Sequence, residues 1–308
     1  MNYSKRGFLK LATTSVMAIQ SFSRAQAAPL ETFKGDLCLF SKHLPTLRWQ
    51  HLAQITKKIG FNGIDLTVRP GGHVLPERVV EDLPQAFAAI NAEGLSVPMI
   101  TTGLTLASDL TAKPILSVAG KLGIRYFKPG YYKYEFSDVR RELEKFGSEF
   151  SKLTELGKQF GVQCGFHNHD GNIGAPIWDV ATVIDHLDPK WVGYYFDVRH
   201  AVVEGGGGGW KIATNVVAPR LKMIAVKDFY WEKSAKGWGI VNCPLGQGMV
   251  DWQQYFKLLR QANFHGPISL HLEYEISGAT AAAKVENTIA AAQRDLEFLK
   301  ARLQEAYK

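Results

Sequence analysis

Short apolar runs alternate with stretches of helical periodicity along most of this chain. Helical spacing is clearest at residues 47–59, 76–92, 139–160 and 252–262. A chain of alternating strands and helices folds around a mostly parallel sheet whose faces are covered by helices. The apolar runs that we expect to form strands are residues 37–40, 63–68, 97–102, 126–129, 163–169, 192–198, 223–228 and 267–274.

Several of the expected helices end in glycine immediately before the next strand. Gly60, Gly94, Gly123 and Gly161 stand in this position. Glycine adopts the left-handed conformation that ends a helix, so the repeated spacing indicates helix-to-strand turns. Eight strands and their helices predict an α/β fold, a single (β/α)8 TIM barrel, over residues 28–308. A doubly wound open sheet is the alternative, but no G-x-G-x-x-G follows the first strand.

Residues 1–27 differ from the rest of the chain. Lys5 and Arg6 precede a mildly apolar run at residues 11–22, and Ala25-Gln26-Ala27 has the small residues of a cleavage site. Residues 4–10, SKRGFLK, resemble a twin-arginine (Tat) signal with Lys in place of the first Arg. We therefore expect an export signal peptide and a periplasmic protein. An amphipathic anchor that stays attached is the alternative; the run is short for a membrane span, and we expect none after signal removal.

More than half of the net positive charge belongs to this segment. The whole chain has a formal charge of +7, and residues 1–27 hold four basic and no acidic residues, so their removal leaves +3. No later segment concentrates Lys and Arg with stacking aromatic residues, and we expect no nucleic-acid partner. The sequence leaves open whether the protein forms a homo-oligomer.

The three cysteines, Cys38, Cys164 and Cys243, are widely separated. They form no C-x-x-C pair, which excludes a zinc ribbon and thioredoxin-type redox chemistry. Export would permit a disulfide, but the spacing does not indicate one. We expect mostly buried thiols.

Polar side chains gather at the ends of the expected strands and not at their starts. In a (β/α)8 barrel the C-terminal strand ends carry the functional site. Alternation along a strand puts His167 and His169 on one face and Asn168 on the other. Borderline divalent cations take histidine nitrogen and carboxylate oxygen together, which makes a metal site one interpretation. Capping by Asp197 and pairing of Glu273 with an arginine are the structural alternatives.

Four motifs lie on the expected second, sixth, seventh and eighth strands or at their ends: Gly63-Ile64-Asp65-Leu66-Thr67, Asp197-Val198-Arg199-His200, Val226-Lys227-Asp228 and Leu272-Glu273. Together they resemble the xylose-isomerase-like TIM-barrel superfamily, which holds sugar isomerases, ketose 3-epimerases, inosose dehydratases and endonuclease-four repair enzymes. The resemblance runs from Leu37 to the final helix. It implies a divalent metal (Mn, Co, Zn or Mg) held by a Glu, an Asp, a His and a Glu on the fifth to eighth strands.

The resemblance assigns the metal ligands His167, Asp197 and Glu273. His167 stands in place of the family Glu on the fifth strand. Ala225 stands in place of the family His on the seventh strand and cannot bind a metal. His200 or His271 can supply a compensating nitrogen.

The resemblance also implies the chemistry. In the family a metal clamps a carbonyl and a hydroxyl of a sugar while a side chain removes the proton α to the carbonyl. We expect an exported sugar isomerase or epimerase acting on a small carbohydrate. A keto-sugar or keto-glycoside lyase or hydratase and a non-catalytic carbohydrate-binding relative are the alternatives. The expected catalytic residues are Lys227, His169 and His200, and the expected substrate-binding residues are Arg69, Lys128, Asp228 and His271.

Two loops carry further expectations. Tyr131, Phe229 and Tyr230 follow strands, and Trp238 lies in a predicted long loop after the seventh strand. Their flat faces suit sugar rings, or they pack on the barrel rim. The run of residues 205–209, all glycine, lacks the Lys-Ser/Thr of a phosphate-binding loop, and we expect a mobile loop there.

Overall fold

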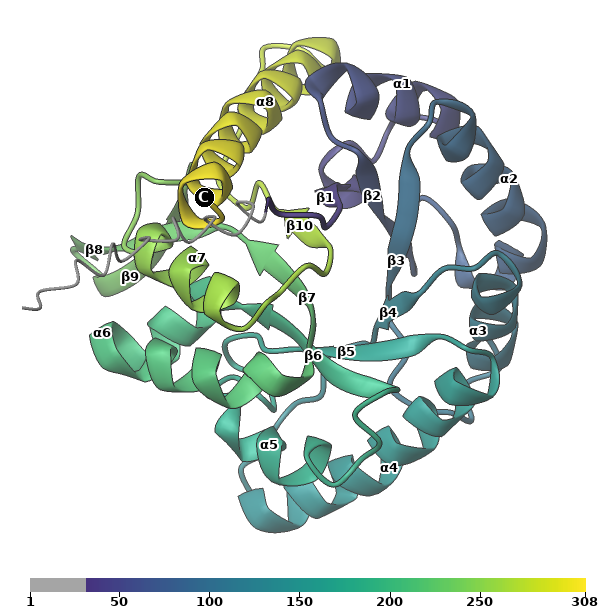
Figure 1. Cartoon of the computed structure of the whole chain (residues 1–308), viewed down its shortest axis with the longest axis vertical. Coiled ribbons are helices and arrows are strands. Elements are labelled where there is room, and N and C mark those ends of the chain that lie inside the picture. Colours follow the sequence, from purple (N-terminus) through teal and green to yellow (C-terminus); the bar gives the residue numbers. More distant parts are fainter. Residues whose placement is uncertain (1–31) are drawn as a thin grey trace, which may run out of the picture. The chain divides into compact units, whose positions relative to one another are not determined.

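Eight parallel strands close into a barrel in residues 32–308, the part of the chain that this computed structural model describes (Figure 1). The predicted signal peptide, residues 1–27, lies outside the described residues. β10 pairs with β1 and closes the barrel, so the single (β/α)8 prediction is confirmed and the open sheet is wrong. The barrel strands are β1 (Leu37–Phe40), β2 (Gly63–Val68), β3 (Ser96–Thr102), β4 (Tyr126–Lys128), β5 (Gln163–His167), β6 (Val192–Asp197), β7 (Leu221–Val226) and β10 (Ile268–Leu270).

Helices surround the barrel, as Figure 1 shows. Each presents an apolar face to the strands; in α4 the buried Phe146, Phe150 and Leu153 recur at helical spacing. The helices are α1 (Trp49–Ile59), α2 (Val79–Ala92), α3 (Ala112–Lys121), α4 (Val139–Gln159), α5 (Trp178–Ile184), α6 (Val198–Val217), α7 (Trp252–Gln261) and α8 (Ala281–Ala306). Short 3-10 helices lie at Ser41–His43, Pro76–Arg78 and Ala218–Arg220.

The glycines predicted at helix ends have the backbone conformation that this role requires. Gly60, Gly94, Gly123 and Gly161 have φ values of 105°, 72°, 75° and 76°. A side chain at any of these positions would strain the backbone. The local signal was therefore sufficient to place these four helix-to-strand turns.

A β-hairpin follows β7 where we expected a long loop. β8 (Asp228–Ser234) pairs antiparallel with β9 (Gly237–Cys243). Asp228 and Phe229 are buried at the start of β8, and the rest of that strand is exposed. Trp238, on β9, is 67% exposed, so it does not pack against the barrel rim.

The glycine run at residues 205–209 lies within α6, and the prediction of a loop is wrong. Gly206 has φ 58° and ψ −154°, a non-helical conformation that kinks the helix there. Glycine reaches this region because it has no Cβ atom. The run therefore breaks α6 into two helical segments.

Buried apolar side chains between strands and helices form the main core. Cys38, Cys164 and Cys243 are free and buried, which confirms the expectation for the thiols. Within residues 32–308 no helix combines the length and apolarity that crossing a membrane requires.

A polar network fills the barrel interior below the strand ends. Asp65 is fully buried and accepts hydrogen bonds from Thr101 Oγ1 and Ser269 Oγ, each at 2.8 Å, and from Tyr195 OH at 3.2 Å. Burial raises the pKa of Asp65 to about 6, although these three donors act to lower it. The network gives the cavity above it a fixed polar floor.

Candidate active site

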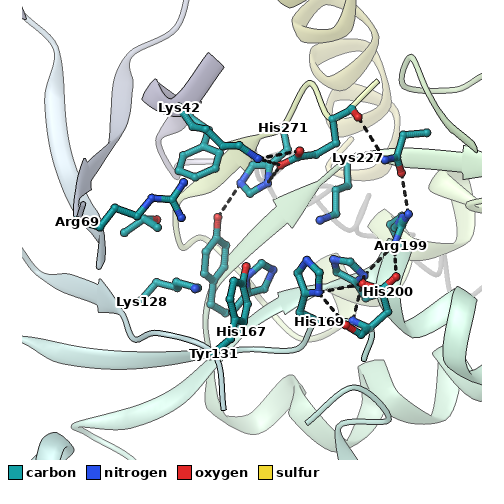
Figure 2. A pocket seen from close by; sticks show the side chains of 16 residues that line it. Lys42, Arg69, Lys128, Tyr131, His167, His169, Arg199, His200, Lys227 and His271 are labelled. Atoms are coloured by element: carbon teal, nitrogen blue, oxygen red, sulfur yellow. Dashed lines mark hydrogen bonds and ion pairs between the residues drawn. The ribbon is translucent and has the colours of Figure 1, made fainter. Parts of the chain in front are cut away.

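The C-terminal ends of the barrel strands surround a cavity of about 310 Å³ (Figure 2). That volume is at the small end of ligand pockets and suits a single sugar unit. Asp197 lies directly behind the cavity wall, and Asp228 lies away from it. The other eight predicted site residues line the cavity: Arg69, Lys128, His167, His169, His200, Lys227, His271 and Glu273.

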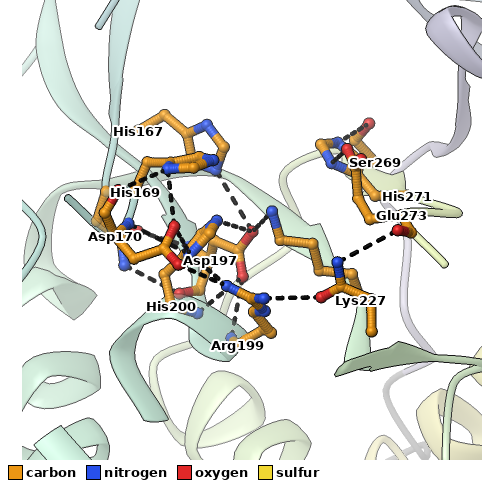
Figure 3. A network of polar contacts seen from close by, with 12 residues as sticks. His167, His169, Asp170, Asp197, Arg199, His200, Lys227, Ser269, His271 and Glu273 are labelled. Atoms are coloured by element: carbon orange, nitrogen blue, oxygen red, sulfur yellow. Dashed lines mark hydrogen bonds and ion pairs between the residues drawn. The ribbon is translucent and has the colours of Figure 1, made fainter. Parts of the chain in front are cut away.

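The two carboxylate oxygens of Asp197 have separate roles, one in capping a helix and one in contacting the side chains of the site. It ends β6, and its Oδ1 accepts the backbone N–H groups of Arg199 at 2.9 Å and His200 at 3.4 Å, which caps α6. Its Oδ2 lies 3.1 Å from Lys227 Nζ, 3.5 Å from His167 Nε2 and 3.7 Å from His200 Nε2 (Figure 3). The capping and metal interpretations are therefore compatible.

Charge in this group is set by burial and by Lys227. Burial acts to raise the pKa of the Asp197 carboxyl, but Lys227, His200 and His167 together hold that pKa well below its usual value. Burial holds the pKa of His167 well below its usual value, against the attraction of Asp197. Burial and then Lys227 lower the pKa of His200 to about 4. At neutral pH the group is one carboxylate and two neutral imidazoles.

Asp170 orients two histidines. Its Oδ1 lies 2.9 Å from His169 Nδ1 and 3.0 Å from His200 Nδ1, and its Oδ2 accepts from Arg199 Nη1 at 3.1 Å. Burial acts to raise the pKa of Asp170, but the hydrogen bonds from both histidines hold it below its usual range. Because carboxylate and carbonyl oxygens only accept, we assign the proton of His169 to Nδ1, so its Nε2 carries the lone pair. His200 Nδ1 also faces two donors, Arg199 Nη1 at 2.9 Å and the backbone N–H of Asp170 at 3.3 Å, so these contacts hold the ring in place without assigning its proton.

The atoms His167 Nε2, Asp197 Oδ2 and His200 Nε2 fit a divalent metal ion. They lie within 4.8 Å of one another. Two ligands of one tetrahedral ion are roughly 3.4 Å apart, close to the 3.5 Å and 3.7 Å separations found here. His200 Nε2 is buried without a hydrogen-bond partner, and Asp170 fixes its ring as carboxylates fix metal-binding imidazoles.

A sequence-family model describing the xylose isomerase-like TIM barrel matches residues 53–302. The chain belongs to this family. L-ribulose-5-phosphate 3-epimerase UlaE of Escherichia coli is 22% identical over 288 residues, 88% of this chain and 95% of the relative. Inosose dehydratase of Mesomycoplasma hyopneumoniae is 24% identical over 160 residues, which spans about half of each protein (48% and 50%).

Solved structures of the same fold agree with the barrel. A xylose isomerase-like TIM barrel protein from Mycobacterium smegmatis, in complex with magnesium, superimposes with a TM-score of 0.68 at 14% identity, over 89% of this chain and 98% of that one. D-psicose 3-epimerase of Clostridium cellulolyticum with D-tagatose superimposes with a TM-score of 0.65 at 12% identity, over 87% and 99%. At these identities the likeness establishes the fold.

The xylose isomerase-like chain departs from the expected ligand pattern on β7. Ala225, where the resemblance implies a histidine, is fully buried beside Tyr195 and Met223. Two residues further on, Lys227 places its ammonium beside Asp197. Position 225 therefore offers no nitrogen ligand, and the Asp197 carboxylate has the Lys227 ammonium beside it instead.

Glu273, predicted as the third metal ligand, lies outside the group of His167, Asp197 and His200. Its carboxylate contacts Lys42 Nζ at 2.9 Å and 3.1 Å. Burial acts to raise the pKa of Glu273, but Lys227 and Lys42 hold it below its usual value. Among the described residues, His200 and not Glu273 brings a donor atom close to those of His167 and Asp197.

His271 lies deeper than Glu273. Its Nε2 is 3.1 Å from Tyr195 OH and 3.2 Å from Ser269 Oγ, which ties it to the polar floor. Its ring stacks on Phe40 with the centroids 4.3 Å apart. Burial and then Lys227 hold the pKa of His271 well below its usual value, so it faces the cavity as a neutral imidazole.

Asp228, predicted to bind substrate, has a structural role instead. Its carboxylate accepts five hydrogen bonds of 2.8–3.3 Å, which leaves no oxygen directed at the cavity. It therefore anchors the chain after β9 to the start of the hairpin. The donors are the backbone N–H groups of Phe229, Gly246, Gly248 and Val250 and the indole of Trp252.

The sequence interpretation missed several cavity residues, among them Lys42 and Asn242. Lys42 lies two residues after the end of β1, so the strand-end rule that found the other residues would have found it as well. Asn242, on β9, accepts from Arg199 Nη2 at 2.7 Å and donates to the Glu273 carbonyl at 3.2 Å. No local pattern reveals Asn242, because only the hairpin brings it to the cavity.

Proposed function

We propose that this protein is a sugar isomerase- or epimerase-like enzyme that moves a proton at the carbon next to a carbonyl group. The observation that carries the proposal is the Asp170 carboxylate, which orients the His169 and His200 imidazoles at one cavity. An imidazole held at Nδ1 by a carboxylate presents Nε2 as a base. The names of the relatives, a 3-epimerase and a dehydratase, support sugar chemistry.

His169 is our candidate for the acid–base group. Its side chain is 33% exposed and lines the cavity, whereas the His200 side chain is 2% exposed behind it. Tyr131 packs edge-on against the His169 ring at 4.7 Å, which restricts its rotation. His169 is therefore positioned to take a proton from a sugar carbon and return it.

Lys227 is our candidate for stabilising the charge that develops on the carbonyl oxygen. Its Nζ is 3.1 Å from Asp197 Oδ2, and the side chain lines the cavity. A fixed cation in a site that excludes water stabilises an oxyanion strongly. Asp197 holds Lys227 in place for this role.

The fit of His167, Asp197 and His200 supports a resident divalent ion, for which Mn, Co, Zn and Mg are the candidates. Such an ion, when bound, polarises a carbonyl and orients the adjacent hydroxyl. Two imidazole ligands favour Zn, Co or Mn over Mg, which prefers oxygen. In this chain Tyr131 OH, 3.3 Å from His167 Nδ1, can accept the imidazole proton and leave Nε2 free.

A lyase or dehydratase is the second candidate. The similarity to inosose dehydratase over 160 residues favours it. Elimination begins with the same proton removal, and only the fate of the resulting enediolate differs. Product analysis distinguishes the two: an epimer retains all atoms of the sugar, and a dehydratase product has lost one water.

Hydrogen exchange into deuterated water tests the proposal. The protein, loaded in turn with Mn, Co, Zn and Mg, is incubated with a panel of keto-sugars and keto-glycosides, and loss of the α proton is followed by NMR. We expect exchange that falls about a hundredfold or more in His169→Asn. Lys211→Met, on the exposed face of α6, is the matched control and should keep the wild-type rate. Absence of exchange on every sugar would contradict the proposal.

We also propose that the protein is exported through residues 1–27. The basic start, the apolar run and Ala25-Gln26-Ala27 support this. The test is N-terminal sequencing of protein from the periplasmic fraction of expressing cells. A start near residue 28 supports export, and an intact cytoplasmic N-terminus contradicts it.

A further inference from the structure

The positive charges of the cavity are of two kinds. Three cations have an acidic partner: Lys227 with Asp197 at 3.1 Å, Arg199 with Asp170 at 3.1 Å and Lys42 with Glu273 at 2.9 Å. Arg69 and Lys128, which also line the cavity, form no ion pair with any acidic side chain in residues 32–308. The two unpaired cations lie on the same side of the cavity, opposite Lys227 and His200 (Figure 2).

Lys128 gives the stronger indication of a bound anion, because its ammonium is buried. The residue is 2% exposed, and its Nζ lies 3.4 Å from the centre of the Tyr131 ring. Burial and then Arg69 lower the pKa of Lys128 to about 7. A buried ammonium without a counter-charge is costly, and buried groups of this kind cluster at functional sites.

The nearest buried carboxylate does not fill this role. Asp65 attracts Lys128 electrostatically, but its two oxygens already accept from Thr101, Ser269 and Tyr195. Arg69 has its guanidinium 5.7 Å from the Phe40 ring and makes no side-chain hydrogen bond within residues 32–308. Both cations therefore have hydrogen-bond donors available to the cavity.

We propose that Arg69 and Lys128 bind the carboxylate of a sugar acid. This rests on the proposed function, whose substrate class it narrows. The planar guanidinium of an arginine matches a carboxylate with two parallel hydrogen bonds, and the lysine adds a point charge. With its carboxylate on this wall, a sugar presents its other carbons to His169 and Lys227 on the facing wall (Figure 2).

A carboxylate fits this wall better than a phosphate does. Phosphate sites usually offer several backbone N–H groups from a helix N-terminus or a glycine-rich turn. The Arg69–Lys128 wall consists of side chains, with the aromatic rings of Phe40 and Tyr131 beside them. The cavity of about 310 Å³ also leaves little room for a phosphate beyond one sugar ring.

Calorimetric binding of three matched probes tests the proposal. D-glucuronate, D-glucose and D-glucose 6-phosphate share one ring and differ only at the sixth carbon; D-gluconate adds an open-chain acid. We expect each acid to bind at least tenfold more tightly than D-glucose. Lys128→Met and Arg69→Met should each lower the ratio of acid affinity to D-glucose affinity at least tenfold. Lys211→Met, which also removes a cation beside an aromatic ring, should leave that ratio unchanged.

Several results would overturn the proposal. One is equal or absent binding of the acids and glucose, and another is a preference that persists in both cavity variants. Tighter binding of the 6-phosphate than of the acids would overturn the carboxylate assignment. Lys128→Met conserves side-chain length, and thermal melting verifies that each variant is folded. Because binding is measured without turnover, an acid preference without α-proton exchange contradicts the proposed function alone, and exchange without a preference contradicts this inference alone.

Discussion

Lys227 Nζ lies 3.1 Å from Asp197 Oδ2, the same oxygen that faces the Nε2 atoms of His167 and His200. A metal ion at these three ligands and the ammonium of Lys227 would therefore compete for one carboxylate oxygen. Two cations around a single buried oxygen repel each other strongly. The Lys227 ammonium would therefore stabilise an oxyanion in the cavity and also weaken metal binding at Asp197.

The first prediction is that Lys227→Met binds a divalent metal more tightly than the wild type. Removing the competing ammonium should raise the affinity for Zn or Co about tenfold or more. Titration of metal-stripped protein against a chelating dye measures it, with Lys211→Met as the control. Weaker binding by Lys227→Met would mean that the amine is itself a ligand.

The second prediction concerns Asp197→Asn. The amide can still cap α6, but Lys227 loses its buried counter-charge. Breaking one side of a buried ion pair should lower the free energy of unfolding by about 3–5 kcal/mol and abolish metal binding. Urea denaturation and the dye titration measure the two effects. The double variant Asp197→Asn/Lys227→Met should recover part of the stability, and its failure to do so would show that the pair is not coupled.

The fold was predictable because its signals are local and repeated. Gly60 and Gly161 mark helix ends through their own conformation, whatever lies elsewhere. The polar residues at the strand ends were predictable for the same reason, since the fold alone directs them to one cavity.

The pairing of those residues was not predictable. Whether Glu273 or His200 stands beside Asp197 depends on side-chain directions, and Glu273 turns to Lys42. Asp228 follows Lys227 directly, yet its carboxylate faces the chain after β9. Four donors to it come from that distant segment, and the fifth is the adjacent backbone N–H of Phe229. Asn242 reaches the cavity through a hairpin whose position no sequence pattern encodes.

The third prediction concerns Asp170 as a positioning residue. Asp170→Asn removes the negative charge that holds both imidazoles and replaces one carboxylate oxygen by an NH2 donor, so the exchange rate should fall about 10- to 100-fold and its pH profile should change. Asp228→Asn is the matched control: it should lower stability without changing the rate per folded molecule. Equal effects of the two substitutions on rate would contradict the positioning role.

The fourth prediction is a pH-dependent gain in stability for Lys128→Met. The pKa of Lys128 is about 7 in the folded protein, below its ordinary value, because of burial and the nearby cations Arg69 and Lys227, against the attraction of Asp65. Below pH 7 the side chain is charged in both folded and unfolded states, and the full destabilisation is present. Above pH 7 the folded protein releases the proton first, so the wild type becomes more stable as the pH rises.

Lys128→Met should therefore be more stable than the wild type by about 1–3 kcal/mol at pH 6, and this advantage should shrink by pH 10. Urea denaturation at several pH values measures it, with Lys211→Met as the control. An advantage that is constant with pH would mean that lost or gained packing, and not charge, determines the difference.

The fifth prediction links Lys128 to its ligand. A carboxylate beside the ammonium favours the charged form, so binding should raise the pKa of Lys128 from about 7 towards its ordinary value. At about pH 8.5 the free protein holds mostly neutral Lys128, and binding of D-glucuronate should take up close to one proton. At about pH 5.5 the side chain is already charged, and the uptake should be close to zero.

Calorimetry in two buffers of different ionisation enthalpy measures the number of protons taken up on binding. In Lys128→Met the uptake at high pH should vanish; if it persists there, another group takes the proton, and the carboxylate lies elsewhere in the cavity.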